Sequence, residues 1–335
     1  IKQFNVEEIM RKKFLFMTLF VSAMPLSVLA GNISSIDTKV NTVMKVRVAK
    51  QGNDNIIIGS DYNGVVLASD YSGNILWRTD VGNGTMNHDL WCDDIDADGK
   101  QEVFAANANG SIVCLDLKGN IRWTFTPYDG VHRTPMYSVC VVKSNNKPYV
   151  VCGDFSTDCY YLDALTGKLV QKLPSKNYSK AKVFKIDKKY NFQHIANFLR
   201  PIPLDKGNDL LLMHGSNNHM QSSGEFYVIE PLKNKVLSHV VKPLKQRGTI
   251  GDVRVVDPDG DGTYEVIFGS SVLNGNEFGR IEFSNSYTEA KLFSYPIQQK
   301  NVGKVSYRVN QPFILYENSG YDYGVLSSNA MVFFS

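Results

Sequence analysis

The sequence predicts an all-β protein, a β-propeller of four-stranded blades, and three observations lead to this prediction. Segments of the chain repeat at a fixed offset close to the length of one propeller blade. Within each copy, short apolar runs are separated by turns that contain Asn-Gly or another glycine, which is the strongest local signal for hairpins. Aromatic residues make up 11% of the chain, and no apolar spacing of 3.6 residues persists through a repeat, which argues against a helical solenoid.

The first two copies are residues 57–77 and 103–123. They align at every position with an offset of 46 residues, so that Gly64 corresponds to Gly110. The other aligned pairs are Asp70 with Asp116, Gly73 with Gly119 and Trp77 with Trp123. A third copy, residues 150–170, keeps an Asp and a Gly in the matching places, and weaker copies follow. About six repeat units result: 45–88, 89–136, 137–180, 200–250, 251–300 and an incomplete 305–335.

Closure of the propeller needs a partner for the incomplete last unit. Residues 34–50 are one candidate for the missing strand, and the alternative is that the chain is a fragment of a seven- or eight-bladed protein. The Lys-rich residues 174–199 lack the strand pattern and are interpreted as an insertion between blades.

The N-terminal region has the layout of a secretory signal peptide. A basic start, Met10 to Lys13, precedes an apolar run from Phe14 to Leu29, and Val28-Leu29-Ala30 is a small-x-small cleavage sequence. The run is too short for a spanning helix. We therefore expect residues 1–30 to be upstream sequence and signal peptide, and 31–335 to form one exported propeller domain, periplasmic, cell-surface or secreted, with no membrane span.

Charge and cysteine content restrict partners and cross-links. The chain carries 36 Lys and Arg against 33 Asp and Glu, a net charge of +3, which argues against a general nucleic-acid or membrane-surface binder. Its five cysteines leave at least one unpaired. Cys152 and Cys159 are predicted to face each other across a hairpin, so a cross-strand disulfide stays open, although buried free thiols are the favoured interpretation.

Two segments contain the pattern Asp-x-Asp-x-Asp-Gly-x-x-Glu. Carboxylates at alternating positions converge when a glycine at the sixth place lets the chain turn sharply, and such hard oxygen ligands suit Ca²⁺. The predicted ligands of the first loop are Asp94, Asp96, Asp98, Glu102 and the backbone carbonyl of Lys100. Those of the second loop are Asp257, Asp259, Asp261, Glu265 and the backbone carbonyl of Thr263. The alternative is a solvated acidic turn without a metal.

These motifs resemble two families of propeller repeats. The Asp loops, each followed by a strand, are similar to the calcium loops of FG-GAP (integrin-type) repeats, which implies two structural Ca²⁺ ions. The sequence Leu-Asp-x-x-Thr-Gly-Lys-Leu at 162–169, with Gly-Asn-Ile-x-Trp at 73–77 and 119–123, resembles quinoprotein-like (PQQ-like) repeats. No adjacent cysteine pair is present, so we expect no PQQ and regard a quinoprotein dehydrogenase as the least favoured function.

Basic and imidazole groups are predicted where the innermost strands begin, around one mouth of the channel. They are His88, His132, Arg133, Arg200 and Arg247. A cationic ring of this kind attracts an anionic ligand. The alternative is that these groups pair with carboxylates at the strand ends, such as Asp89 and Asp252.

The sequence thus favours an exported, calcium-holding propeller that acts as a non-enzymatic binding or scaffold module for an anionic glycan or a protein partner. The competing class is a polysaccharide lyase that eliminates at a uronate. For that reaction His132, Arg133 and Tyr137 are the candidate catalytic residues, with an arginine neutralising the carboxylate.

Overall fold

The computed structural model describes most of the chain beyond residue 42 in β-strands. The described residues are 2–4, 38, 42–127, 134–155, 158–174, 177–178, 184–187, 190–192, 195–216, 222–243, 248–272, 275–297, 311–317, 320–326 and 331–334. They contain six four-stranded antiparallel sheets and one two-stranded sheet, with no α-helix. The predicted propeller of four-stranded blades is therefore confirmed.

The chain divides into two compact units, and the larger one holds residues 36–247 and 283–291. Four sheets of this unit follow one another along the chain, each with its strands in sequence order. The first two sheets are β2 (Val43–Gln51), β3 (Asp54–Asp61), β4 (Val65–Ser69), β5 (Ile75–Asp80), and β6 (Asn87–Asp93), β7 (Glu102–Asn107), β8 (Ile112–Leu115), β9 (Ile121–Phe125). The next two are β10 (Met136–Ser144), β11 (Lys147–Asp154), β12 (Asp158–Asp163), β13 (Leu169–Pro174), and β16 (Ile195–Ile202), β17 (Leu210–Ser216), β18 (Ser222–Glu230), β19 (Lys235–Pro243).

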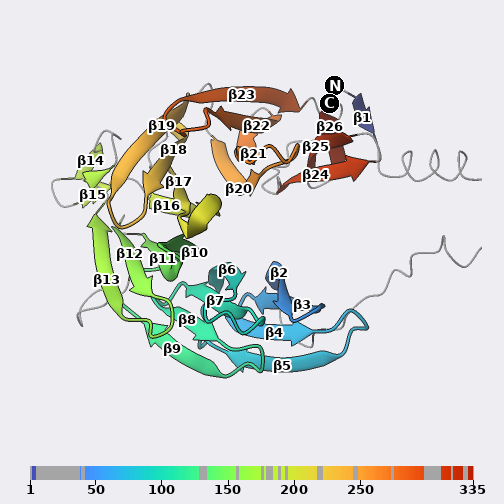
Figure 1. Cartoon of the computed structure of the whole chain (residues 1–335), viewed down its shortest axis with the longest axis vertical. Coiled ribbons are helices and arrows are strands. Elements are labelled where there is room, and N and C mark those ends of the chain that lie inside the picture. Colours follow the sequence, from blue (N-terminus) through green and yellow to red (C-terminus); the bar gives the residue numbers. More distant parts are fainter. Residues whose placement is uncertain are drawn as a thin grey trace, which may run out of the picture. The chain divides into compact units, whose positions relative to one another are not determined.

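In this unit the first strand of each sheet is the innermost and the fourth the outermost (Figure 1). Neighbouring inner strands contact each other, β2 with β6, β6 with β10, and β10 with β16. Side chains of adjacent sheets fill the space between them, as Ile58 with Leu90, Phe104 with Met136, and Tyr161 with Tyr227. The alternation of side chains along each strand therefore lets a sheet that lies between two neighbours bury both faces, whereas β2 of the first sheet leaves Val46 and Val48 exposed on one face.

A tryptophan on the outer strand fixes each of the first two sheets to the next one. Trp77 Nε1 donates to the Leu117 carbonyl at 2.7 Å, and Trp123 Nε1 donates to the Ala164 carbonyl at 2.9 Å. Each indole also packs on a turn glycine, Gly119 or Gly167, where a Cβ would lie 2.8 or 2.6 Å from the ring. The repeat-equivalent Trp and Gly of the sequence thus form one contact that recurs from sheet to sheet.

The predicted insertion at 174–199 is shorter than expected. Its described part contains β14 (Phe184–Asp187) and β15 (Tyr190–Phe192), which pair with each other. Residues 195–199 instead begin β16, and Ala196 and Leu199 pack in the core beside β10 and β17. Of residues 34–50, one candidate for the missing strand of the last unit, residues 43–50 belong to β2 and pair with β3, the adjacent strand in the chain.

The smaller unit holds residues 1–35, 248–282 and 292–335. One of its sheets consists of β20 (Gly248–Val256), β21 (Glu265–Val272), β22 (Gly275–Phe283) and β23 (Ala290–Ile297). The other has the order β1-β26-β25-β24, with β24 (Gln311–Glu317), β25 (Gly320–Leu326), β26 (Met331–Phe334) and β1 (Lys2–Phe4). Phe278 stacks on Phe334 at 4.7 Å in the core of this unit.

Three further predictions concern the signal peptide, the absence of a membrane span and the bounds of the domain. The signal peptide and its cleavage sequence lie outside the described residues. No helix in the part of the chain that the structure describes is long and apolar enough to cross a membrane. A single domain from 31 to 335 stays a prediction.

The disulfide between Cys152 and Cys159 is not formed, and all five cysteines are free. Cys152 pairs with Tyr160 across the hairpin, whereas Cys159 pairs with Gly153. This one-residue offset places the two thiols in different core clusters, on opposite faces of the sheet. The prediction that they face each other was wrong by one position of register.

Candidate binding face and acidic loops

The first strand of five sheets carries a β-bulge near its beginning. The shifts in register fall at 43/45, 87/89, 136/138, 196/198 and 250/252. The extra residues are Met44, His88, Tyr137, Asn197 and Gly251. A bulge leaves its extra residue outside the ladder and changes the direction of its side chain, and bulges are enriched next to binding sites.

In the larger unit these bulges bring two of the predicted site residues together. Asn87 and Met136, which precede the bulges, are buried, whereas His88 and Tyr137 are half-buried. The rings of His88 and Tyr137 stack with centroids 4.4 Å apart at 22°, and Phe155 follows 5.6 Å from Tyr137. His88 Nδ1 lies 2.7 Å from the Met136 carbonyl, so it carries the proton and donates it. Burial lowers the pKa of His88, with the charge of Lys45 acting in the same direction.

Asp89, next to this bulge, holds two arginines from other strands. Its carboxylate lies 2.9 Å from Arg47 Nη2 on β2 and 2.9 Å from Arg200 Nη1 on β16. Burial alone raises the pKa of Asp89, but the charges of Arg200 and Arg47 outweigh it, so the pKa is lowered and the carboxylate stays ionised. Arg200 also stacks over Trp91 at 5.6 Å.

Of the five residues of the predicted cationic ring, only His88 and Arg200 lie among the residues that the structure describes. His88 lies at the beginning of its strand as expected. Arg200 lies deep in β16, 5% exposed and ion-paired with Asp89, rather than at a strand start. His132, Arg133 and Arg247 lie outside the described residues, so the lyase chemistry built on the first two stays a prediction.

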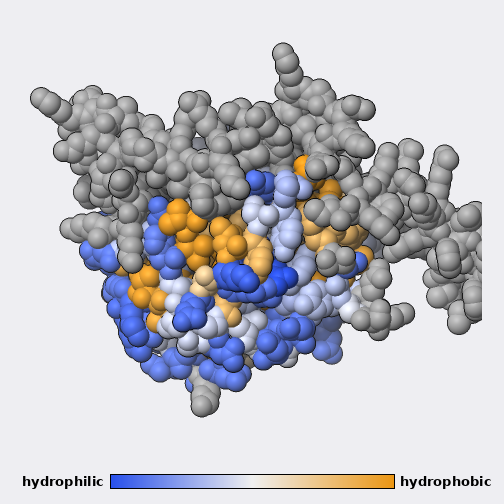
Figure 2. Space-filling model, turned by 90° about the horizontal axis from the view of Figure 1, so that it is seen from above, coloured by the Kyte–Doolittle hydropathy of each residue, from blue (hydrophilic) through white to orange (hydrophobic). Residues whose placement is uncertain are grey.

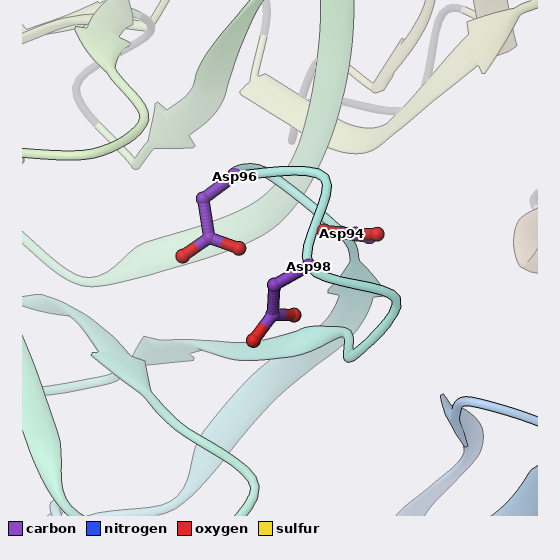
Figure 3. Close-up of side chains that lie close together, drawn as sticks. All are labelled: Asp94, Asp96 and Asp98. Atoms are coloured by element: carbon purple, nitrogen blue, oxygen red, sulfur yellow. The ribbon is translucent and has the colours of Figure 1, made fainter.

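The first acidic loop brings its three aspartates together, as Figure 3 shows. One carboxylate oxygen from each of Asp94, Asp96 and Asp98 lies within 4.8 Å of the others. Gly99, at φ 82°, closes the turn and donates its N–H to Asp94 Oδ2 at 3.0 Å. The other oxygen, Asp94 Oδ1, is buried without a hydrogen-bond partner in the described structure. A buried carboxylate oxygen of this kind fits a cation.

The second loop repeats this geometry. Asp257, Asp259 and Asp261 likewise offer oxygens within 4.8 Å of one another. Gly262, at φ 84°, donates to Asp257 Oδ2 at 3.1 Å. The agreement between loops 163 positions apart (94 to 257) shows that the motif itself dictates the conformation.

The two glutamates of the motif are engaged elsewhere. Glu102 accepts a hydrogen bond from Arg122 Nη1 at 2.6 Å, and the same Nη1 lies 2.9 Å from Asp96. Glu265 accepts the Tyr323 hydroxyl and lies 3.5 Å from Arg280 Nε. The backbone amides of Lys100 and Thr263 donate to Asp98 and Asp261. The structure thus groups three aspartates per loop and gives each glutamate an arginine.

The first loop is fastened to the preceding sheet. Gly52 N donates to the Gly99 carbonyl at 2.7 Å, and Gln101 N donates to the Lys50 carbonyl at 3.0 Å. Lys50 N in turn donates to the Gln101 side chain at 2.8 Å. Ordering this loop would therefore also order the junction between the first two sheets.

Sequence reasoning missed Arg47, Lys45 and Phe155. Lys45 and Arg47 occupy the first and third places after their bulge, and Arg200 occupies the third place after the bulge in β16. An alignment of the inner strands would have revealed this relation. The weak similarity of these strands, and the inserted residue in each, hid it.

Comparison with known proteins adds a relationship in sequence. Residues 56–335 match the family model described as the lambda-carrageenase β-propeller domain. Curated proteins named lambda-carrageenase, from Pseudoalteromonas sp. and Pseudoalteromonas carrageenovora, are each 35% identical to the chain over 280 residues. That alignment covers 83% of this chain but only 29% of each relative.

Solved structures support the fold alone. Saccharomyces cerevisiae Sqt1 aligns with 89% of this chain and 73% of its own, with a TM-score of 0.56 and 12% identity. The Cps50 (Swd1) β-propeller domain of Myceliophteria thermophila aligns with 88% of this chain and 86% of its own, with a TM-score of 0.56 and 14% identity. The FG-GAP and quinoprotein-like repeat types stay predictions.

Proposed function

Because the chain belongs to the lambda-carrageenase β-propeller family, we propose that it is the propeller part of an exported carbohydrate-active protein and binds a sulfated galactan. The observation that supports this proposal is the 35% identity over 280 residues to proteins named lambda-carrageenase. The chain spans 29% of the length of those relatives, so the activity in their name belongs to a much longer protein. What we assign to this part is binding without cleavage.

The mixed polarity of the surface and the low net charge of the chain are consistent with specific binding of one polyanion rather than general attraction to any polyanion. The face in Figure 2 mixes hydrophilic with apolar residues, and the net charge of the chain is only +3. A uniformly basic surface would bind nucleic acid and glycan alike. Sugar recognition instead needs apolar faces combined with a few placed polar groups.

We further propose that the two aspartate loops hold structural Ca²⁺. In each loop three clustered carboxylates repel one another without a cation, and the buried Asp94 Oδ1 of the first loop lacks a hydrogen-bond partner in the described residues. Asp94, Asp96 and Asp98, and Asp257, Asp259 and Asp261, would hold the ions. When bound, Ca²⁺ would neutralise these charges and stiffen the loops, and through Gly99 and Gln101 the first loop would stiffen the junction with the preceding sheet.

The test is affinity electrophoresis of the purified chain in native gels that contain lambda-carrageenan. We expect its migration to be retarded in these gels and unchanged in gels with neutral agarose alone. Gels with dextran sulfate control for unspecific attraction to a polyanion. Equal migration with and without lambda-carrageenan would contradict the proposed binding.

A second measurement separates binding from catalysis. Reducing ends are counted after incubation of lambda-carrageenan with the chain, and unsaturated products are followed by ultraviolet absorbance in a separate incubation with a uronate polysaccharide such as alginate. We expect neither to increase. A rise in reducing ends would assign cleavage to this part of the protein, and a rise in absorbance would favour the lyase alternative.

A further inference from the structure

We propose that His88, Tyr137 and Phe155 form a sugar-stacking platform and that Lys45 beside it holds an anionic substituent of the same glycan chain. This inference rests on the proposed galactan binding and assigns it a place. The platform consists of two bulged residues on adjacent inner strands and one residue directly after β11. The flat faces of pyranose rings pack on aromatic rings, which supply apolar area at a low cost in conformational entropy.

The platform differs from aromatic packing in the core of the same unit. Tyr227 and His239 also stack with centroids 4.4 Å apart, but Tyr227 is fully buried, and both polar atoms are bonded to Glu225. His88 and Tyr137 are half-buried instead. In the described structure the Tyr137 hydroxyl and His88 Nε2 have no hydrogen-bond partner, so the hydroxyl can donate to a ligand's sulfate or hydroxyl oxygen, and Nε2, which carries no proton, can accept from a ligand's hydroxyl.

The platform is held in place before any ligand arrives. The hydrogen bond between His88 and the Met136 carbonyl joins β6 to β10. Phe155 N donates to the Pro135 carbonyl at 2.9 Å, which fixes the third ring beside the second. Because these bonds orient the rings, little conformational entropy remains to be lost on binding.

Charge complementarity favours an anionic sugar over a neutral one. Asp89, next to His88, is already neutralised by Arg47 and Arg200. Asp154, next to Phe155, is buried and accepts hydrogen bonds from the Tyr160 hydroxyl and the Asp158 amide. Lys45 directly follows the bulge of β2, the inner strand that contacts β6, and it has no salt bridge among the described residues. Its charge lowers the pKa of both His88 and Asp89. The platform therefore has a positive charge at its border that is not taken up by a partner.

The test compares variants of the platform with a matched control in the lambda-carrageenan gels. Tyr137→Ala and His88→Ala are each expected to weaken binding about tenfold or more, by about 1.4 kcal/mol. Tyr137→Leu keeps apolar volume without the ring and serves if Tyr137→Ala fails to fold. Tyr71→Ala, at an aromatic residue 58% exposed on an outer turn, is the control and should bind like the wild type. Thermal melting reports whether each variant is folded.

The results with these variants and with the wild type distinguish the platform proposal from the proposed galactan binding. Lys45→Ala should weaken binding of lambda-carrageenan and reduce its dependence on salt, because one ion contact is lost. Folded His88 and Tyr137 variants that bind as tightly as the wild type would overturn the platform while leaving galactan binding intact. A wild-type chain that does not bind at all would overturn both.

Discussion

Arg200 Nη1 lies 2.9 Å from Asp89 Oδ2, although 111 residues separate the two in the chain. The other oxygen of the same carboxylate lies 2.9 Å from Arg47 Nη2. One buried aspartate thus joins the inner strands of three sheets, β2, β6 and β16. The sequence suggested Arg200 as a ligand-binding group and left pairing with a strand-end carboxylate as the alternative, and the structure shows that pairing.

Asp89→Asn is expected to destabilise the protein by about 3–5 kcal/mol, because it leaves the buried charge of Arg200 and the partly exposed charge of Arg47 without their counter-ion. The loss should appear as a lower Tm in calorimetry, by roughly 5–15 °C. The double variant Asp89→Asn with Arg200→Gln should lose less than the sum of the single losses, because the charge is then removed together with its partner. Additive losses would show that the pair is not coupled.

Gly119→Ala is expected to destabilise the protein more than Gly84→Ala. Both glycines have φ 84°, so the left-handed backbone conformation destabilises both alanine variants equally, by about 1–2 kcal/mol. At Gly84 a Cβ meets no atom within 4 Å, whereas at Gly119 it lies 2.8 Å from the Trp77 indole. The extra overpacking cost is about 1–3 kcal/mol. Urea unfolding of the pair measures the difference, and equal midpoints would refute the Trp–Gly contact between the first two sheets.

Calcium is expected to raise the Tm by several degrees relative to a chelator, because an ion bound only by the folded state stabilises it. Asp98→Asn and Asp261→Asn should each reduce this rise, since each removes one ligand charge. Calorimetry with and without calcium checks this, and magnesium serves as the control ion. A Tm that is the same in calcium and in chelator would leave the loops as acidic turns.

Arg122→Gln is expected to tighten calcium binding at the first loop by roughly tenfold. The Arg122 guanidinium contacts Asp96 and so competes with the ion for that carboxylate. Arg78→Gln, at an exposed arginine bonded to the Thr38 carbonyl, is the control and should leave the affinity unchanged. Isothermal titration with calcium gives both values, and unchanged affinity in the Arg122 variant would show that the ion does not use Asp96.

Stability is expected to fall as the pH drops below about 6.5, in part through His88. Burial and the charge of Lys45 lower the pKa of His88 in the folded state, while Asp89 and the Met136 carbonyl act against this. In the unfolded chain histidine binds its proton near pH 6.5, so acid favours unfolding below that value. His88→Gln should therefore make the urea midpoint less dependent on pH. An identical pH dependence in wild type and variant would contradict this role.

The sequence alone determined the features that depend on local chemistry. Strand alternation, Asn-Gly turns and the offset from Trp77 to Trp123 predicted four-stranded units, since each repeat folds by pairing strands next to each other in the chain. The Asp loops were predictable for the same reason: their conformation depends on a glycine and aspartates within a few residues.

Only the tertiary structure decided what lies together across the repeats. A single bulged residue moves His88 or Tyr137 out of the ladder, and a one-residue offset places Cys152 and Cys159 on opposite faces; repeat spacing does not show either shift. The partner of Arg200 depends on how separate sheets pack. Side-chain direction in a strand alternates with every residue. A repeat whose register is uncertain by one residue therefore still predicts a four-stranded blade, but it does not predict on which face of the sheet a given side chain lies.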